Sequence, residues 1–243
     1  MAVGRFAALG SMICLMALHA VAAEAPLQIA TEESPPMNYM QNGQVTGEAT
    51  DLIRAVAERA AVPISIELLP WLRAYQRAID QPNSCVYSTT ITEERKSLFK
   101  WVGPIGQNEW VIYGRTDSPI VLNTVEDAKP FDLGVYNGDV RVDYFEELGG
   151  YHLSIAPDFI GAVRQLSAGH TDLLAGDRSV QVFAKREGIT NLKPLLVIKR
   201  VPVALACNRA VPDATIDKLQ AALNELEADG KAEEIRRIYR SGL

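Results

Sequence analysis

The sequence is poor in the residues that build metal centres. Only three cysteines and three histidines occur in 243 residues, and no CxxC, HxxxH or HExxH spacing is found among them. A phosphate-binding glycine loop, a GxSxG elbow and a recognisable Cys/His signature are absent as well. We therefore expect no metal and no cofactor, and the common hydrolase classes are disfavoured.

An excess of basic residues is also missing. The chain has 24 Lys and Arg against 30 Asp and Glu, which gives a formal net charge of −6. Such a surface does not attract nucleic acid, so no nucleic-acid partner is expected. Fixed-period repeats and low-complexity tracts are lacking too, which excludes a solenoid or a disordered scaffold.

The one long apolar run lies at the N-terminus. Arg5 precedes the apolar segment 6–18, and the small residues 20–23 follow it. This pattern is typical of a secretory signal, since a membrane helix needs ~20 apolar residues. We predict a signal peptide over residues 1–23 and a periplasmic mature chain with 23 basic and 30 acidic residues. A membrane anchor is the alternative interpretation.

Strand-like and helical patterns alternate along the mature chain. In its first part, strands are predicted over 27–30, 64–68 and 85–88, with helices over 48–60 and 71–79. In its second part, strands are predicted over 132–135, 152–155 and 173–175, with helices over 140–148 and 158–167. Such alternation indicates two α/β units, each with a mostly parallel sheet flanked by helices.

Two extended stretches, 109–115 and 195–207, show no helical period and are interpreted as crossings between two lobes. The helical C-terminal segment is expected to pack back on the first lobe. We accordingly predict lobe 1 from residues 24–110 plus 203–243, and lobe 2 from residues 111–202.

Polar side chains cluster where the strand over 85–88 ends. Thr90 follows this strand, Thr92 suits the N-cap of a short helix, and Arg95 lies one turn further on. Ligands of open α/β sheets bind at the carboxyl ends of the strands, and an arginine fork suits a carboxylate. The alternative is a capped surface helix with an exposed arginine.

Five segments, in chain order, carry a resemblance to a known family. They are PPMNYMQNGQVTGEATDL, STTITEERKSLFKWVGPI, GVYNGDVRVDYF, LSAGHTDLLAGD and NELEADGKAEEIRRIY. These resemble motifs of family 3 extracellular solute-binding proteins, the amino-acid-binding components of ABC transporters. The resemblance implies a two-lobed, type II periplasmic-binding-protein-like α/β fold joined by two crossing strands. It also implies a small-molecule ligand (an amino acid or related carboxylate) and an inner-membrane ABC permease as partners; we expect a monomer.

The resemblance assigns roles to particular residues. It implies that Thr90 and Arg95 hold the α-carboxylate of the ligand, that Asp177 receives its α-ammonium, and that the backbone N–H of Gly138 approaches it. For Asp177 the alternative is an exposed loop acid beside Arg178.

Two further residues are candidates for the site, and a third residue differs from the family motif. Trp71 would pack over the ligand or else belong to the core, and Arg73 is a cleft residue or a solvated helix residue. Asp139 stands where the family usually has Thr or Ser. Its charge would repel a simple amino acid unless a cation compensates.

The strand arrangement of the family also implies a position for Cys85 and Cys207, the two cysteines that remain after signal cleavage. It places the returning strand antiparallel beside the third strand of lobe 1, which would bring Cys85 close to Cys207. A disulfide is then expected in an oxidising compartment. Two buried free thiols are the alternative.

We expect a binding protein rather than an enzyme. The alternatives on the same scaffold are a dehydratase-like periplasmic enzyme and a component of a sensor. An enzyme would need a proton-transfer group, and Glu48, Asp139, His152 and Asp177 are its candidates.

Overall fold

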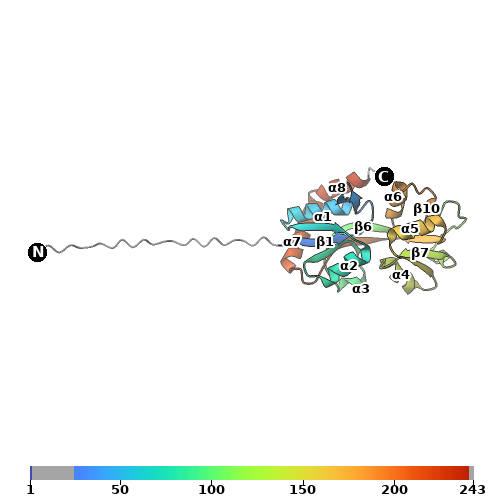
Figure 1. The fold of residues 1–243 in the computed structure, drawn as a ribbon, viewed down its shortest axis with the longest axis horizontal. Helices are drawn as coiled ribbons and strands as arrows, with labels where there is room; N and C mark the ends of the chain where they lie inside the picture. The colour runs from blue at the N-terminus through green and yellow to red at the C-terminus, as the bar shows by residue number, and fades with distance from the viewer. Residues whose placement is uncertain (2–24, 241–243) are drawn as a thin grey trace.

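The computed structural model describes Met1 and residues 25–240, so the predicted signal peptide lies outside the described residues, apart from Met1. Two lobes share one sheet (Figure 1). Its strands are β4 (Ile64–Leu68), β1 (Leu27–Thr31), β5 (Ser84–Thr90), β10 (Leu192–Cys207), β6 (Lys100–Arg115), β9 (Leu173–Gly176), β7 (Asp132–Tyr136) and β8 (His152–Ala156), in this spatial order. The two-lobed α/β fold predicted from the sequence is confirmed.

Lobe 1 is built on the parallel strands β4, β1 and β5. One face is covered by α1 (Glu48–Arg59), α7 (Asp213–Ala228) and α8 (Lys231–Arg240), whose apolar residues pack with those of β1. Leu52 and Leu223 are among the fully buried members of this core, and each such side chain contributes roughly 1.5–3 kcal/mol by leaving water. The C-terminal helices therefore belong to lobe 1, as predicted.

The other elements of lobe 1 border the cleft. The helix α2 (Trp71–Asp80) packs against β5, and the short helix α3 (Glu93–Lys96) follows that strand. A hairpin of β2 (Tyr39–Gln41) and β3 (Gln44–Thr46) precedes α1. Its turn at Asn42 and Gly43 has positive φ at both residues, as expected for this dipeptide.

Lobe 2 is built on the parallel strands β8, β7 and β9. The helices are α4 (Val140–Leu148), α5 (Phe159–Ala168) and α6 (Ser179–Arg186), with a short 3-10 helix, η1 (Val125–Ala128). Figure 1 places α5 and α4 on opposite sides of the lobe 2 strands, and their apolar residues belong to two different core clusters. Both faces of the sheet are thus covered, as in other parallel sheets.

The strands β6 and β10 join the lobes. They pair antiparallel from Lys100 opposite Cys207 to Arg115 opposite Leu192. In lobe 1 the last residues of β10 pair with β5, and in lobe 2 the last residues of β6 pair with β9. Each joining strand thus has pairing partners in both lobes, and the division of the chain after residues 110 and 202 stays a prediction.

Both joining strands are longer than predicted, because they begin before the stretches 109–115 and 195–207. The strands continue through residues that interrupt the sequence pattern. Pro194 stays paired with Tyr113, whereas Gly103 and Pro104, joined by a cis peptide bond, lie at an irregularity of the ladder. Register shifts along β10 accommodate these breaks. The helix α6 was not predicted from the sequence.

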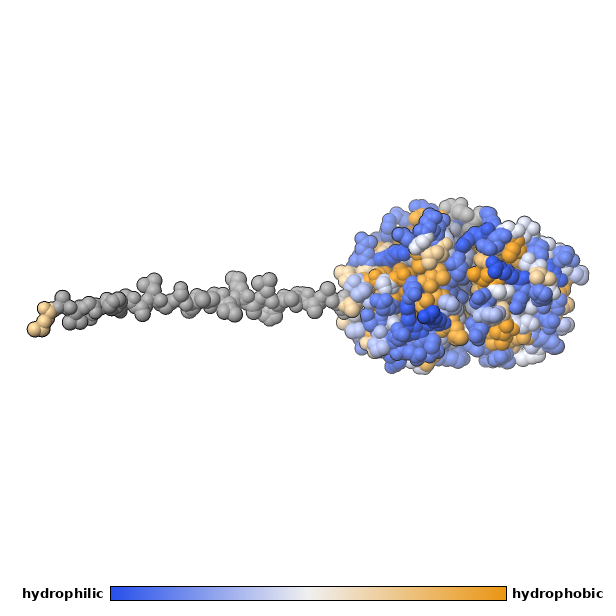
Figure 2. All heavy atoms as spheres, in the orientation of Figure 1, coloured by the Kyte–Doolittle hydropathy of each residue, from blue (hydrophilic) through white to orange (hydrophobic). Residues whose placement is uncertain are grey.

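The surface seen in Figure 2 is mostly hydrophilic, with hydrophobic patches on both lobes. No helix within residues 25–240 is long and apolar enough to cross a membrane.

Cys85 and Cys207 form a disulfide in the structure. The two residues lie directly opposite each other in the β5–β10 ladder, with their Cα atoms 4.0 Å apart. The bond therefore fixes the lobe 1 end of a joining strand to the lobe 1 sheet, as the family resemblance implied.

The double substitution Cys85→Ala with Cys207→Ala is expected to lower the free energy of unfolding by up to about 4–5 kcal/mol. The bond closes a loop with a sequence separation of 122 residues, and long loops lose the most entropy in the unfolded chain. Chemical denaturation of the oxidised chain from Glu24 onward measures this difference. Thiol labelling of the denatured, unreduced protein should find no free thiol, and two free thiols per chain would contradict the bond.

Candidate functional site

The carboxyl ends of strands from both lobes meet at one small pocket, which we name the inner pocket. It has a volume of about 40 Å³. Glu32 follows β1, Thr90 ends β5, Tyr136 ends β7 and Asp177 follows β9. The remaining lining residues used below are Ser34, Trp71, Ser88, Arg95, Asn108, Asp139 and Arg141. A site at this position agrees with the rule for ligands of open α/β sheets.

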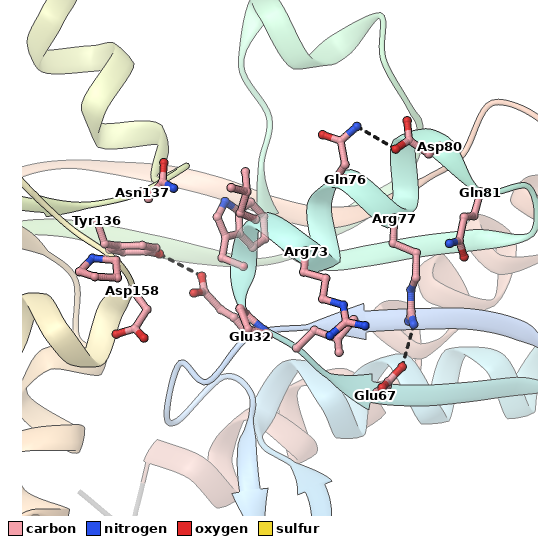
Figure 3. A pocket seen from close by; sticks show the side chains of 15 residues that line it. Glu32, Glu67, Arg73, Gln76, Arg77, Asp80, Gln81, Tyr136, Asn137 and Asp158 are labelled. Atoms are coloured by element: carbon pink, nitrogen blue, oxygen red, sulfur yellow. Dashed lines mark hydrogen bonds and ion pairs between the residues drawn. The ribbon is translucent and has the colours of Figure 1, made fainter.

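A wider cavity, the outer groove, adjoins the inner pocket (Figure 3). Its volume is about 720 Å³, and it shares Glu32, Trp71 and Tyr136 with the inner pocket. Figure 3 shows Arg73, Arg77 and Glu67 along its lobe 1 side. The cleft between the lobes thus has a small interior pocket and a much larger groove beside it.

Arg95 is a buried cation on the lobe 1 side of the inner pocket. The residue is only 7% exposed, although it belongs to the short exposed helix α3. Thr92 caps this helix by accepting from the Arg95 backbone N–H at 3.3 Å, as predicted. The guanidinium lies 4.9 Å from the centre of the Tyr75 ring, and no carboxylate of residues 25–240 forms an ion pair with it.

Trp71 and Arg95 both reach across the cleft to the same atom of lobe 2. The Trp71 indole donates to the Gly138 carbonyl oxygen at 2.7 Å, and Arg95 Nη2 lies at 3.5 Å from that oxygen. Gly138 has φ +76°, and a Cβ there would meet the Trp71 ring at 3.2 Å. Glycine is therefore required here both by the backbone and by the close approach of the indole.

Ser88 has an uncommon backbone conformation within the strand that leads to Thr90. Its φ is +60°, and its hydroxyl donates to the Asn38 side-chain oxygen at 2.5 Å. Positive φ is rare in residues other than glycine, and such conformations concentrate at functional sites. The bend lies on the wall of the inner pocket, two residues before Thr90.

On the lobe 2 side, two acids share one arginine. Arg141 Nε donates to Asp139 at 2.8 Å, and Arg141 Nη1 donates to Asp177 at 3.2 Å. Asp177 also accepts from Asn108 at 2.8 Å, from the Ser179 backbone N–H at 2.9 Å and from the Ser179 hydroxyl. Arg141 is the cation that the acid at position 139 required.

These contacts determine the electrostatics of the cluster. Burial raises the pKa of Asp177, but the charge of Arg141 and the bonds from Ser179 and Asn108 bring it below its ordinary value. For Asp139 burial outweighs Arg141, so its pKa is raised. Burial lowers the pKa of Arg141, yet the two carboxylates more than offset it, and the arginine stays charged.

Glu32 faces the same cluster from lobe 1. The Tyr136 hydroxyl donates to it at 2.9 Å, which links the two lobes (Figure 3). Burial raises the pKa of Glu32 from 4.5 to about 8; the bond from Tyr136 lowers it, and the charges of Asp139 and Asp177 add to the rise. Glu32 is therefore a neutral, protonated side chain near neutral pH.

The structure brings most of the predicted site residues together. Thr90, Arg95, Trp71 and Asp177 line the inner pocket, and the Gly138 carbonyl accepts from Trp71 beside it. Arg73 lies apart from them, exposed in the outer groove.

The four candidate proton-transfer groups are not assembled into one site. Asp139 and Asp177 are bound to Arg141, His152 is exposed at the start of β8, and Glu48 is not among the residues lining the inner pocket. Among the residues that the structure describes, no group of three His, Cys, Asp or Glu side chains is placed to hold a metal.

Sequence reasoning missed Glu32, Asn108, Tyr136 and Arg141. Glu32 and Tyr136 lie at strand ends, so the rule that located Thr90 applies to them as well. The sequence around Arg141 has no comparable feature that would predict a place in the pocket. Its role depends on Asp177, which is 36 residues away and is brought beside it only by the fold.

A two-lobed fold with a charged pocket between its lobes defines a class of ligand-binding proteins. A family model for bacterial extracellular solute-binding proteins, family 3, matches residues 27–241. The chain belongs to this family.

Individual relatives agree with this assignment. The amino-acid-binding protein AabA of Dichelobacter nodosus is 26% identical over 207 residues, which cover 82% of this chain and 81% of that protein. The arginine-, lysine-, histidine-binding protein ArtJ of Geobacillus stearothermophilus has a TM-score of 0.80 at 21% identity, over 88% of this chain and 95% of that chain. A histidine kinase sensor domain similar to periplasmic binding proteins has a TM-score of 0.82 at 21% identity, with the same coverage. The two structural likenesses show the fold alone.

Glu32→Gln is expected to change how stability depends on pH. The pKa of Glu32 is raised from 4.5 to about 8 in the folded protein. The protonated Glu32 side chain therefore contributes fully to the free energy of unfolding below pH 4.5, and this contribution is lost as the pH rises to about 8. The free energy of unfolding of the variant should not fall in this way, so near pH 8 the variant should be more stable than the wild type. Urea denaturation across this range measures it, with Glu67→Gln in the outer groove as the matched control. Equal pH slopes for Glu32→Gln and wild type would disprove the assignment.

Proposed function

We propose that the chain is a periplasmic solute-binding protein that closes on a small amino-acid-like or related carboxylate ligand and delivers it to an ABC permease. The observation that carries this proposal is Arg95, a buried guanidinium that faces the pocket without a carboxylate partner among residues 25–240.

The physical argument concerns the cost of an unpaired buried charge. Burying a cation without an anion carries a large desolvation free energy. A ligand carboxylate would offset this penalty by accepting two parallel hydrogen bonds from the guanidinium. The Thr90 hydroxyl lies on the same wall and would be a further donor. Thr90 and Arg95 are thus the proposed carboxylate-binding residues, with Trp71 and Gly138 closing the cleft beside them.

Closure follows from the arrangement of these groups on two lobes. A ligand held by Arg95 of lobe 1 and by groups of lobe 2 makes contacts that exist only when the lobes are together. Such a ligand shifts the population toward the closed form. The closed surface, formed by both lobes, is what a permease would recognise.

The transport role rests on the family and its relatives. The family is extracellular, AabA is an amino-acid-binding protein by name, and the N-terminal apolar segment fits export. We propose that the protein acts as a monomer.

Arg95→Met is expected to weaken ligand binding more than tenfold while leaving the fold intact. Charge-assisted hydrogen bonds contribute about 1.5–3 kcal/mol each, and 1.4 kcal/mol corresponds to tenfold in affinity. A thermal-shift screen of amino acids and small carboxylates identifies a ligand, and calorimetry then compares the variants. Arg164→Met, which removes an exposed arginine of lobe 2, is the control and should bind like wild type. Wild-type affinity in Arg95→Met would refute the proposal.

A further inference from the structure

The acid expected to receive an ammonium group is already satisfied by the protein. An ionised carboxylate has about four acceptor positions. In Asp177, one oxygen accepts from the backbone N–H and the hydroxyl of Ser179, and the other accepts from Asn108 and Arg141. A ligand ammonium would have to displace one of these donors.

Asp139 offers no better partner. Its side chain is only 2% exposed, and both of its oxygens accept from the Arg141 Nε. The backbone N–H of Arg141 adds another bond at 3.0 Å. The guanidinium of Arg141 thus occupies the space between the two acids, where a ligand cation would otherwise neutralise them.

The excess negative charge of this cluster is met by fixed neutral donors. Asn108 and the two donors of Ser179 bind Asp177, and hydrogen bonds to a carboxylate favour its charged form. Burial raises the pKa of Asp177, but the charge of Arg141 and the bonds from Ser179 and Asn108 together bring it below its ordinary value without any ligand. Asp177 therefore stays ionised without a further cation.

Lobe 1 presents the opposite situation. Arg95 has no carboxylate partner within the described part of the chain, and the other polar groups on its wall are uncharged. They are the hydroxyls of Ser34, Ser88 and Thr90 and the protonated carboxyl of Glu32. This wall matches an anion that carries neutral hydrogen-bonding groups beside its charge.

We propose that the ligand is a small carboxylate whose α-substituent is a neutral hydroxyl or keto oxygen rather than an ammonium group, with Arg141 as the residue that sets this preference. The inference rests on the proposed function, because it assumes that Arg95 binds the carboxylate. The inner pocket, at about 40 Å³, has room for the carboxylate and the α-substituent. A side chain would extend toward the outer groove.

Matched ligand pairs test the preference. Calorimetry on the mature chain compares L-alanine with L-lactate and pyruvate, L-serine with L-glycerate, and L-valine with L-α-hydroxyisovalerate. In at least one set we expect the deaminated acid to bind at least tenfold more tightly than the amino acid. In no set should the amino acid bind tenfold more tightly than the deaminated acid. Arg95→Met should abolish that binding.

The outcomes separate the two proposals. If the amino acids bind as tightly as the deaminated acids or more so, and Arg95→Met abolishes their binding, the proposed function stands and the ligand class is wrong. If neither series binds at millimolar concentration, this inference fails, and the thermal-shift screen decides the proposed function separately. If Arg95→Met leaves the binding unchanged, the proposed function fails and this inference fails with it.

A double variant tests the role of Arg141 directly. Asp139→Asn with Arg141→Met removes one acid and one base, so the formal charge around Asp177 is unchanged while the bond from Arg141 Nη1 is lost. We expect the preference for L-lactate over L-alanine to fall at least tenfold. An unchanged ratio, in a variant whose circular dichroism matches wild type, would show that Arg141 does not set the preference.

Discussion

The antiparallel pairing of β6 with β10 is the constraint on which the rest of the molecule depends. These strands continue from lobe 1 into lobe 2, so the other six strands of the eight-stranded sheet take their places relative to them. The parallel strands of the two lobes consequently direct their carboxyl ends at each other. Side chains that follow β1, β5, β7 and β9 meet in one pocket, although they are distant in sequence. The disulfide between β5 and β10 anchors one end of this ladder.

Within that frame, the charges of the two lobes are arranged differently. Lobe 2 holds two acids and one arginine in a network in which each carboxylate accepts several hydrogen bonds. Lobe 1 contributes an arginine stacked on aromatic rings and a carboxyl that stays protonated. In the first arrangement each carboxylate has hydrogen-bond donors without a ligand, whereas in the second one positive charge has no carboxylate partner within residues 25–240. This asymmetry is the physical basis for a ligand that is an anion.

The sequence predicted the fold because its signals are local and repeated. Alternating strand and helix patterns gave the two units, and family motifs gave their connection. The position of Thr90 and Arg95 in the inner pocket could be predicted because Thr90 lies at a strand end and Arg95 lies one turn after the capping Thr92. Arg141 could not be found in this way, since its partner Asp177 approaches only through the tertiary structure. Arg73 lies in the outer groove, at the mouth of the cleft, and its role in ligand binding stays a prediction.

Small-angle X-ray scattering on the mature chain tests the central claim, that the lobes close on a carboxylate held by Arg95, most directly. The account predicts that L-lactate, or whichever carboxylate is shown to bind, reduces the radius of gyration of the wild type and leaves that of Arg95→Met unchanged. A ligand that binds with measurable heat yet leaves the radius of gyration of the wild type unchanged would contradict closure.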